Sequence, residues 1–424
     1  MREPVDPVPL NCRSWTPSAG CAIGAILVVV GAGCAKERVD EPKEPVAEIS
    51  IGRELTFHSE ILGEDRPIQV ALPSSYARNH RHTRYPVLIL LDGQLFFPSV
   101  TGAVQHLSAD ASPHTPEMIV VGIPSENRVR DSSPSRSMKG PLGVEEQVYE
   151  VSGGADRFLR FLTDELIPHL DRTYSTSGYR ILVGYSFTGL FVMHAIFTRP
   201  EAFDAYLAID PSWWWDGYLL EREARAFITK GSVDRRELFV TTSTNNPPAP
   251  FFPALRYVDT FARMLEATPV AGLRFGMKIY DDETHHSMAL RSVYDGLTHI
   301  FDGYMPTLDT LYAHPDRLEA QYEALSRRLG TELFLAEGLV NYFGYLFLNT
   351  YRDVDKALFY FDLNARHYPK SANVWDSLAE AHAAKGDRSA AIAGYKRSLE
   401  LDPGNSNAAA QLKKLGSPAS GSAE

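Results

Sequence analysis

A regular alternation of apolar runs and amphipathic stretches, between about residues 65 and 305, constrains the fold of this chain more than any other feature. Short runs typical of buried strands recur at 67–73, 85–93, 117–123, 179–185, 205–210, 237–243 and 275–281. Apolar residues at helical spacing separate several of them, at 154–174, 187–200, 257–268 and 287–304. Because strands that are apolar throughout must be covered on both faces, this order predicts an α/β fold with a doubly wound, mostly parallel sheet.

A second unit is expected toward the C-terminal end, where the strand signals stop and one spacing recurs. Three pairs of residues share an offset of 34: Pro369 with Pro403, Ala357 with Ala391, and Phe361 with Tyr395. This is the period of the tetratricopeptide repeat, in which paired helices approach through small residues and a proline ends the second helix. We therefore predict an all-α tetratricopeptide-like repeat module over 315–415 and a disordered tail over 416–424.

The three cysteines, Cys12, Cys21 and Cys34, all precede the predicted globular units. Neither unit can therefore contain a disulfide, a thiolate nucleophile or a Cys-ligated zinc. The apolar run that ends at Cys34 is too short to span a bilayer and finishes in small residues, as in a bacterial lipobox. We expect a signal peptide and lipobox over 1–34, lipidation of Cys34, a tether over 35–50, and a periplasmic or outer-membrane-anchored lipoprotein. A non-cleaved apolar N-terminus is the alternative.

Composition narrows the classes of partner and cofactor. The net charge of −11 at pH 7 disfavours nucleic-acid binding, which requires clustered Lys and Arg. The sequence carries no phosphate-binding loop, zinc-protease or EF-hand pattern, so we expect no cofactor and no metal.

The chemistry is expected at Ser186, which lies between the predicted strand 179–185 and the helix 187–200. Gly184 and Gly189 complete a GxSxxG pattern, and in this strand–turn–helix context the pattern predicts a nucleophile elbow. Such an elbow exposes the serine Oγ above the sheet, next to a helix N-terminus that favours developing negative charge. Thr188 departs from the usual motif, which has Gly at this position.

A base is sought after the last strand of such a fold, where the chain offers His285 and His286. Either imidazole satisfies this argument from position.

Several blocks of sequence, in order, resemble the Putative esterase family of α/β-hydrolases, which includes siderophore trilactone esterases. The resemblance covers about residues 50 to 305 and rests on GRELTFHSEILGEDRPIQVALP, YPVLILLDGQLFF, GYSFTGLF, PSWWWD and ETHHSMALRSVYDGL. It implies an α/β-hydrolase domain over 51–308, with Ser186 as nucleophile and His285 rather than His286 as base. It also implies an oxyanion hole built from the backbone N–H groups of Gln94 and Phe187.

The acid of the triad departs from the family pattern. Relatives commonly place a carboxylate after the strand 237–243, where this chain has Asn245 and Asn246. Asp210 ends the neighbouring strand, and we predict that it is the relocated acid. A turn cap before Pro211 is the alternative role for Asp210, and a Ser-His dyad without an acid is the remaining option.

Substrate-binding side chains are sought near the predicted elbow. Trp214 and Trp215 offer large rigid surfaces for an acyl or aryl group, with core packing as the alternative. Arg130 is a candidate for contact with an anionic or polar substrate, with a salt bridge to Asp131 as the alternative.

The sequence thus predicts a serine hydrolase that cleaves carboxylic esters through an acyl-enzyme, with siderophore-type or other small esters as substrates. Acyl transfer to an alcohol would use the same groups. The alternative from another class is a catalytically degraded hydrolase that serves as a binding scaffold, with a protein or peptide partner on the repeat module.

Overall fold

The computed structural model of the chain describes residues 49–109, 113–245 and 254–416. The predicted signal peptide, Cys34, most of the tether and nearly all of the predicted tail lie outside the described residues, so these expectations stay predictions. Within the described ranges, no helix combines the length and apolar character needed to cross a bilayer.

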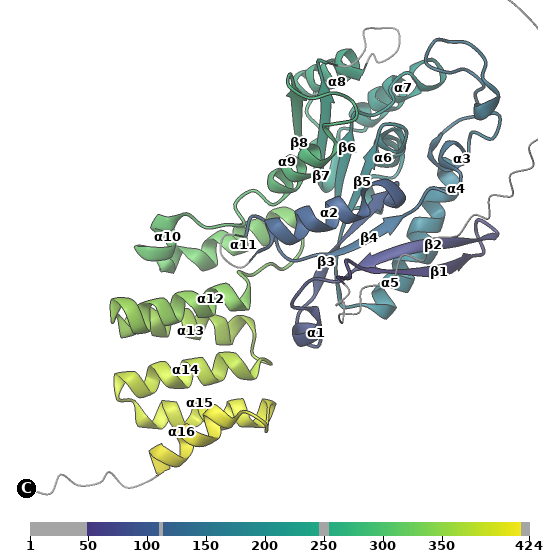
Figure 1. Cartoon of the computed structure of the whole chain (residues 1–424). Coiled ribbons are helices and arrows are strands. Elements are labelled where there is room, and N and C mark those ends of the chain that lie inside the picture. The colour runs from purple at the N-terminus through teal and green to yellow at the C-terminus, as the bar shows by residue number, and fades with distance from the viewer. Residues whose placement is uncertain (1–48, 110–112, 246–253, 417–424) are drawn as a thin grey trace, which may run out of the picture. The chain divides into compact units, whose positions relative to one another are not determined.

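In the described part of the chain eight strands form one sheet, in the order β1-β2-β4-β3-β5-β6-β7-β8 (Figure 1). The strands are β1 Arg53–Ser59, β2 Glu64–Ala71, β3 Tyr85–Leu91, β4 Ile119–Ile123, β5 Thr176–Tyr185, β6 Ala205–Ile209, β7 Ser232–Ser243 and β8 Ala271–Tyr280. Strand β2 pairs antiparallel with both β1 and β4, whereas the pairs from β4 through β8 are parallel. The predicted α/β architecture with a mostly parallel sheet is confirmed.

Helices cover both faces of the sheet, as the apolar strands require. Side chains alternate along β3, so that Leu88 and Leu90 join one apolar core while Val87 and Ile89 join the other. The first core includes side chains from α2 Gly93–Leu107 and α9 Ala289–Ile300. The second core includes side chains from the helices α4 Ala155–Arg160, α5 Ile167–Thr173, α6 Phe187–Thr198, α7 Trp215–Lys230 and α8 Ala254–Ala267.

The single helix predicted over 154–174 is interrupted by a different winding. A π-helical segment, η2 Phe161–Leu166, lies between α4 and α5. Its Phe161, Leu162 and Leu166 are all buried. The side-chain spacing therefore still presents one apolar face to the sheet, which is why the sequence pattern looks continuously helical. Shorter helices are α1 Tyr76–Asn79 and α3 Arg128–Ser132, with the 3-10 turns η1 Gln147–Tyr149 and η3 Pro200–Ala202.

The C-terminal region of the described chain is all helical. Its elements are α10 Leu308–Tyr312, η4 Pro315–Arg317, α11 Leu318–Leu329, α12 Glu337–Tyr345, η5 Leu346–Tyr351, α13 Val354–His367, α14 Ala372–Lys385, α15 Arg388–Leu401 and α16 Ser406–Gly416. Helices α13 and α15 are both 14 residues long, and residues at equivalent places in the predicted repeats, Ala357 and Ala391, are both buried. The helical class is confirmed, and the tetratricopeptide identity of the helices stays a prediction.

Helix α11 packs against the end of the sheet domain through a buried ion cluster. Glu237 of β7 is 3 % exposed, and its carboxylate accepts from Arg328 of α11 at 2.6 Å and from Arg274 of β8 at 2.9 Å. Tyr322 and Leu325 of α11 belong to the same apolar core as the sheet residues. One continuous core therefore joins the sheet to the first C-terminal helices.

Candidate active site

Ser186 lies at the sharp turn between β5 and α6, in a backbone conformation that few residues adopt. Its φ of 58° and ψ of −109° are outside the ordinary regions for an L-residue. The turn is tight enough that a Cβ on Gly184 would meet the carbonyl oxygen of Thr188 at 2.4 Å. A Cβ on Gly189 would meet the carbonyl oxygen of Ile209 at 3.1 Å. The GxSxxG spacing therefore reflects a real steric requirement, and the strained serine is the feature expected of a nucleophile elbow.

Three side chains predicted to act together lie in one hydrogen-bonded row. The Nε2 atom of His285 is 3.0 Å from Oγ of Ser186, and its Nδ1 atom is 2.6 Å from Oδ2 of Asp210. Asp210 and His285 are 2 % and 7 % exposed. This is the arrangement by which an acid fixes the tautomer of an imidazole that faces a hydroxyl.

Asp210 follows β6 in a left-handed conformation, with φ of 41°. Its N–H donates to the carbonyl oxygen of Thr241, and its Oδ1 accepts from Oγ1 of Thr242 at 2.7 Å. The carboxylate is thus held by the neighbouring strand β7, with Oδ2 left to meet His285. Thr242 has no role among the residues predicted from the sequence, although the polar run Thr241–Ser243, directly after the apolar residues 238–240 and next to the strand of a candidate acid, was a usable signal.

His285 is presented by the loop between β8 and α9, and several bonds fix this loop. Oγ of Ser243 donates to the carbonyl oxygen of Glu283. The side-chain carboxylate of Glu283 accepts from Oγ of Ser287 at 2.5 Å. His286 points elsewhere, because its Nδ1 atom lies 3.1 Å from the phenol oxygen of Tyr185. Burial raises the pKa of Tyr185, so its phenol is protonated and uncharged at neutral pH.

Asn245, one of the two positions at which the family resemblance predicts an acid, contacts the chain that precedes His285. Its amide Nδ2 donates to the carbonyl oxygen of Asp281, and its N–H donates to Oγ of Ser243. Asn246 lies outside the described residues. Asp281 and Asp282 are exposed, and Asp282 pairs with Arg291 at 2.7 Å.

Two segments are predicted to form the oxyanion hole: the start of α6, next to Ser186, and the start of α2, which follows β3. Phe187 is the first residue of α6, and Gln94 is the second residue of α2. Gly93, between Asp92 and Gln94, allows the chain to pass close to β4, since a Cβ there would meet N of Ile123 at 2.8 Å. The assignment of the two N–H groups to an oxyanion stays a prediction.

The aromatic residues after Asp210 divide into core and surface. Trp215 is fully buried, and its indole N–H donates to Oγ of Ser135 at 3.1 Å. The expectation that Trp215 contacts substrate is therefore wrong, and the core-packing alternative holds for it. Trp214 is only partly buried, with ring centroids 6.0 Å from both Phe187 and Tyr149. Trp214 stays the candidate for an acyl or aryl contact.

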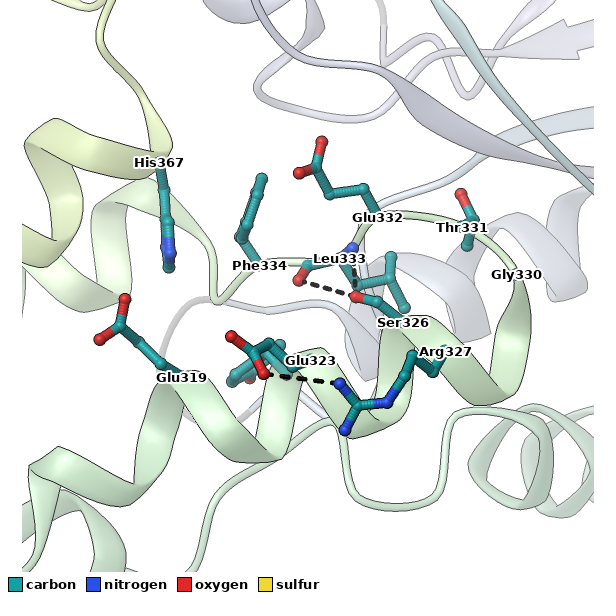
Figure 2. A pocket seen from close by; sticks show the side chains of 11 residues that line it. Glu319, Glu323, Ser326, Arg327, Gly330, Thr331, Glu332, Leu333, Phe334 and His367 are labelled. Atoms are coloured by element: carbon teal, nitrogen blue, oxygen red, sulfur yellow. Dashed lines mark hydrogen bonds and ion pairs between the residues drawn. The ribbon is translucent and has the colours of Figure 1, made fainter.

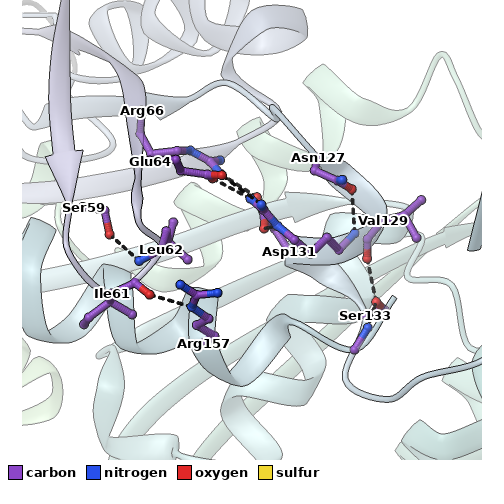
Figure 3. Close-up of polar contacts among 12 residues, drawn as sticks. Ser59, Ile61, Leu62, Glu64, Arg66, Asn127, Val129, Asp131, Ser133 and Arg157 are labelled. Carbon is purple, nitrogen blue, oxygen red and sulfur yellow. Dashed lines mark hydrogen bonds and ion pairs between the residues drawn. The ribbon is translucent and has the colours of Figure 1, made fainter. Parts of the chain in front are cut away.

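Arg130 belongs to an ion cluster with Glu64, Arg66 and Asp131, and these three partners are labelled in Figure 3. Its Nε donates to Asp131 at 2.7 Å, and its two Nη atoms donate to Glu64. Arg66, which is fully buried, bonds the same two carboxylates. The hydrogen bond from Arg130 holds the pKa of Glu64 at about 2, well below its usual range. Each nitrogen of the Arg130 guanidinium thus has a carboxylate partner, which favours the salt-bridge alternative for Arg130, and the substrate contact stays a prediction.

Two further features bear on where a ligand could bind. A cleft of about 530 Å³ lies over α11, with Phe334 and His367 on one side, and none of its lining residues belongs to the row at Ser186 (Figure 2). Among the described residues, no group of three or more His, Cys, Asp or Glu side chains is placed to hold a metal ion. The groups in the row at Ser186 can perform nucleophilic and acid–base chemistry.

Comparison with known proteins places this geometry in a family. Residues 59–245 match the family described as Putative esterase. The crystal structure of an IroE-like serine hydrolase from Shewanella oneidensis is 31% identical, with a TM-score of 0.68, and the match covers 74% of this chain and 99% of that one. The chain belongs to this esterase family.

Curated relatives of the esterase family match over a smaller share of their length. A siderophore triacetylfusarinine C esterase from Aspergillus fumigatus is 30% identical over 196 residues, which are 40% of this chain and 66% of that protein. A ferri-bacillibactin esterase from Bacillus subtilis is 31% identical over 156 residues, which are 34% of this chain and 54% of that protein. The chain thus matches between about half and two thirds of the length of these relatives.

Proposed function

We propose that the protein is a serine esterase that hydrolyses carboxylic esters through an acyl-enzyme on Ser186. The observation that carries the proposal is the row Ser186–His285–Asp210, with its two short contacts of 3.0 and 2.6 Å. Membership of the esterase family supports it independently.

The proposed reaction has two halves, acylation and deacylation of Ser186, and the three side chains of the row act in both. Nε2 of His285 takes the proton from Oγ of Ser186 as that oxygen attacks the ester carbonyl, and His285 then gives the proton to the departing alkoxide. Water next attacks the acyl-enzyme and loses its proton to His285. As the second tetrahedral intermediate collapses, the bond from the acyl carbon to Oγ breaks, His285 returns the proton to Oγ of Ser186, and the acid product leaves. The carboxylate of Asp210 keeps Nδ1 protonated and stabilises the imidazolium. The backbone N–H groups of Gln94 and Phe187 would bind the oxyanion of each tetrahedral intermediate.

For the substrate class we propose siderophore-type esters. The support is that relatives at 30% and 31% identity are named as esterases of triacetylfusarinine C and of ferri-bacillibactin. The half-buried indole of Trp214 offers a flat apolar surface beside Phe187 for the acyl portion.

Two further proposals concern the rest of the chain. We propose that Cys34 is lipidated, so that the esterase is an exported lipoprotein at the periplasmic or outer-membrane surface, on the strength of the lipobox-like sequence. We also propose that helices α12 to α16 are tetratricopeptide-type repeats, on the strength of the 34-residue spacing. Metabolic labelling with a fatty acid, compared with a Cys34→Ala variant, tests the anchor: label that persists in the variant contradicts it.

The test of the central proposal is covalent labelling by a fluorophosphonate followed by a screen of esters. We expect stoichiometric label on the wild-type protein, none on Ser186→Ala, and turnover that is greatest on siderophore-type lactones. If the protein is labelled but hydrolyses only simple activated esters, the esterase proposal stands and the proposal of siderophore-type substrates is contradicted. A folded wild-type protein without label or turnover would instead favour the binding-scaffold alternative.

A further inference from the structure

A buried carboxylate connects the nucleophile elbow to the segment that holds the second oxyanion-hole residue. Asp92 follows β3 in a left-handed conformation, with φ of 55°, and is fully buried. It precedes Gly93 and Gln94 directly, so its position fixes where the first turn of α2 begins. A buried charge is costly unless it is paired and hydrogen-bonded, and a left-handed non-glycine residue is strained. The surrounding structure must therefore compensate for both.

Thr188 supplies one of the bonds that hold Asp92. Its hydroxyl accepts from the N–H of Tyr185 at 2.8 Å and lies 2.9 Å from Oδ2 of Asp92. The carbonyl oxygen of Tyr185 is also within reach, at 3.0 Å. A hydroxyl has one proton, and a bond to a charged acceptor is the stronger of the two, so the proton belongs to Asp92. Thr188 thereby ties the residue before Ser186 to the residue before Gly93.

Arg128 also bonds both Asp92 and Tyr185. Its Nε and Nη2 atoms donate to the carboxylate of Asp92 at 3.0 and 2.9 Å, and Nη2 also donates to the carbonyl oxygen of Tyr185 at 2.8 Å. Oγ of Ser125 donates to the other carboxylate oxygen of Asp92 at 2.7 Å. The guanidinium thus neutralises Asp92 and repeats the link to Tyr185 that Thr188 makes.

We propose that Thr188, Asp92 and Arg128 form a clamp that holds the two segments of the oxyanion hole in register, and that Thr188 is a positioning residue for ester hydrolysis. The proposal rests on the proposed esterase function. It accounts for the departure of this chain from the Gly of the family motif, because a glycine has no hydroxyl to bond Asp92. Thr188 does not act on the imidazole, since His285 is held by Asp210, a separate carboxylate.

The clamp matters because an oxyanion hole works by geometry. Backbone N–H groups stabilise the tetrahedral intermediate only where they meet the oxyanion at hydrogen-bond distance. A displacement of about 1 Å can cost roughly 100-fold in rate. Loss of one bond of the clamp should therefore lower kcat, which depends on the oxyanion, more than it changes KM.

The experiment compares variants of the full chain on one activated ester. Thr188→Val removes the hydroxyl at nearly constant volume, and Thr188→Ser keeps it. We expect kcat to fall on the order of 10-fold to 100-fold in Thr188→Val, with KM within about twofold, and Thr188→Ser to stay within about threefold of wild type. Thr101→Val is the matched control, because Thr101 and Thr188 are both 2 % exposed and the hydroxyl of Thr101 has no hydrogen-bond partner among the described residues.

Two further readouts separate positioning from general damage. Affinity for a trifluoromethyl ketone, which forms an oxyanionic hemiketal with the serine, should weaken in parallel with kcat. The midpoint of the kcat/KM pH profile should not move, because the clamp does not contact His285. If Thr188→Val does not fold, Arg128→Gln tests the same clamp and should show the same split between kcat and KM.

The outcomes are separable from those of the esterase proposal. An active wild type with an unchanged kcat in Thr188→Val, an equal loss in Thr188→Ser, or a shifted pH midpoint would overturn the clamp and leave the esterase in place. A wild type that neither turns over esters nor accepts a fluorophosphonate would overturn both.

Discussion

Oδ2 of Asp210 lies 2.6 Å from Nδ1 of His285, although the two residues are 75 positions apart in the chain. The contact joins the end of β6 to the loop that follows β8. The imidazole therefore has a carboxylate partner although Asn245 stands at a position where the family resemblance predicts the acid. Asp210 follows β6, the strand next to β7, and the other ring nitrogen of His285 faces Ser186.

If Asp210 is the acid of the triad, replacing its carboxylate by an amide should have a large effect on kcat. Asp210→Asn keeps the size of the side chain and removes its charge, so the imidazolium loses its stabilisation and the wrong tautomer becomes available. We expect kcat to fall by a factor on the order of 10⁴ while the protein stays folded. Asn245→Ala is the control and should change kcat by less than about tenfold. Equal losses in the two variants, or a nearly unchanged Asp210→Asn enzyme, would favour a Ser-His dyad.

The two adjacent histidines predict opposite results. His285→Ala should abolish turnover, because its Nε2 atom faces Ser186 at 3.0 Å. His286→Ala removes only an exposed ring that contacts the phenol of Tyr185, and kcat should stay within about threefold of wild type. The measurement is steady-state hydrolysis of one activated ester by both variants. An essential His286 with a dispensable His285 would contradict the assignment.

The core of this site could be predicted from sequence because its residues follow the geometry of the fold. Ser186 lies after one parallel strand and Asp210 after the next, and the carboxyl ends of parallel strands lie at one edge of a sheet. The clamp could not be predicted in the same way. Asp92, Thr188 and Arg128 come from three distant segments, and their contacts depend on side-chain directions that a single sequence does not reveal. The same limit explains why the sequence predicts substrate contacts for Trp215 and Arg130, whereas the structure places Trp215 in the core and Arg130 in an ion cluster.

A histidine on the helix that follows the elbow predicts a pH dependence of stability. His194 is 4 % exposed, and its two ring nitrogens lie 2.8 Å from Glu223 and 3.1 Å from Asp156. Burial opposes the charged ring, but the bonds to the two carboxylates outweigh it and raise the pKa of His194 from 6.5 to about 9. Because the folded-state pKa is the higher one, this stabilisation is complete below about pH 6.5 and is lost as pH rises through about 9.

The measurement is the free energy of unfolding at pH 6 and pH 9 for the wild type and His194→Gln. We expect the wild type to lose up to about 3 kcal/mol more than the variant between these two pH values. Using the difference between the proteins removes the contribution of other titrating groups. An equal loss in both proteins would contradict the assignment of His194 as a buried cation.

Helix α11 predicts that the sheet domain does not tolerate loss of the whole helical region. Truncation after Tyr312 removes Tyr322, Leu325 and Leu329 from the core, each worth about 1.5–3 kcal/mol of burial, and leaves Glu237 without Arg328. We expect an insoluble or strongly destabilised product. Truncation after Pro403 removes only α16, and it should leave solubility and kcat close to those of the full chain. A soluble, active product that ends at Tyr312 would show that the helices are an accessory.

This coupling shows where sequence periodicity stops being informative. The spacing between Pro369 and Pro403 predicts a pair of helices between them, and α14 and α15 lie there. This prediction succeeds because helix formation depends mainly on residues that are close together in the sequence. Which side chains of α11 meet β7 depends instead on Arg328 and Glu237, which are 91 residues apart. The boundary predicted at residue 308 therefore marks a change from strands and helices to helices alone, while one apolar core continues across it.

The most direct test of the account is the mass of the protein caught during turnover. The wild type should be mixed with a p-nitrophenyl ester, quenched in acid within the first turnovers, and analysed as intact protein and as peptides. The account predicts a mass increase of one acyl group on the peptide that contains Ser186, and no such increase in Ser186→Ala or His285→Ala. Hydrolysis that proceeds without an adduct on Ser186, and that persists in Ser186→Ala, would contradict it.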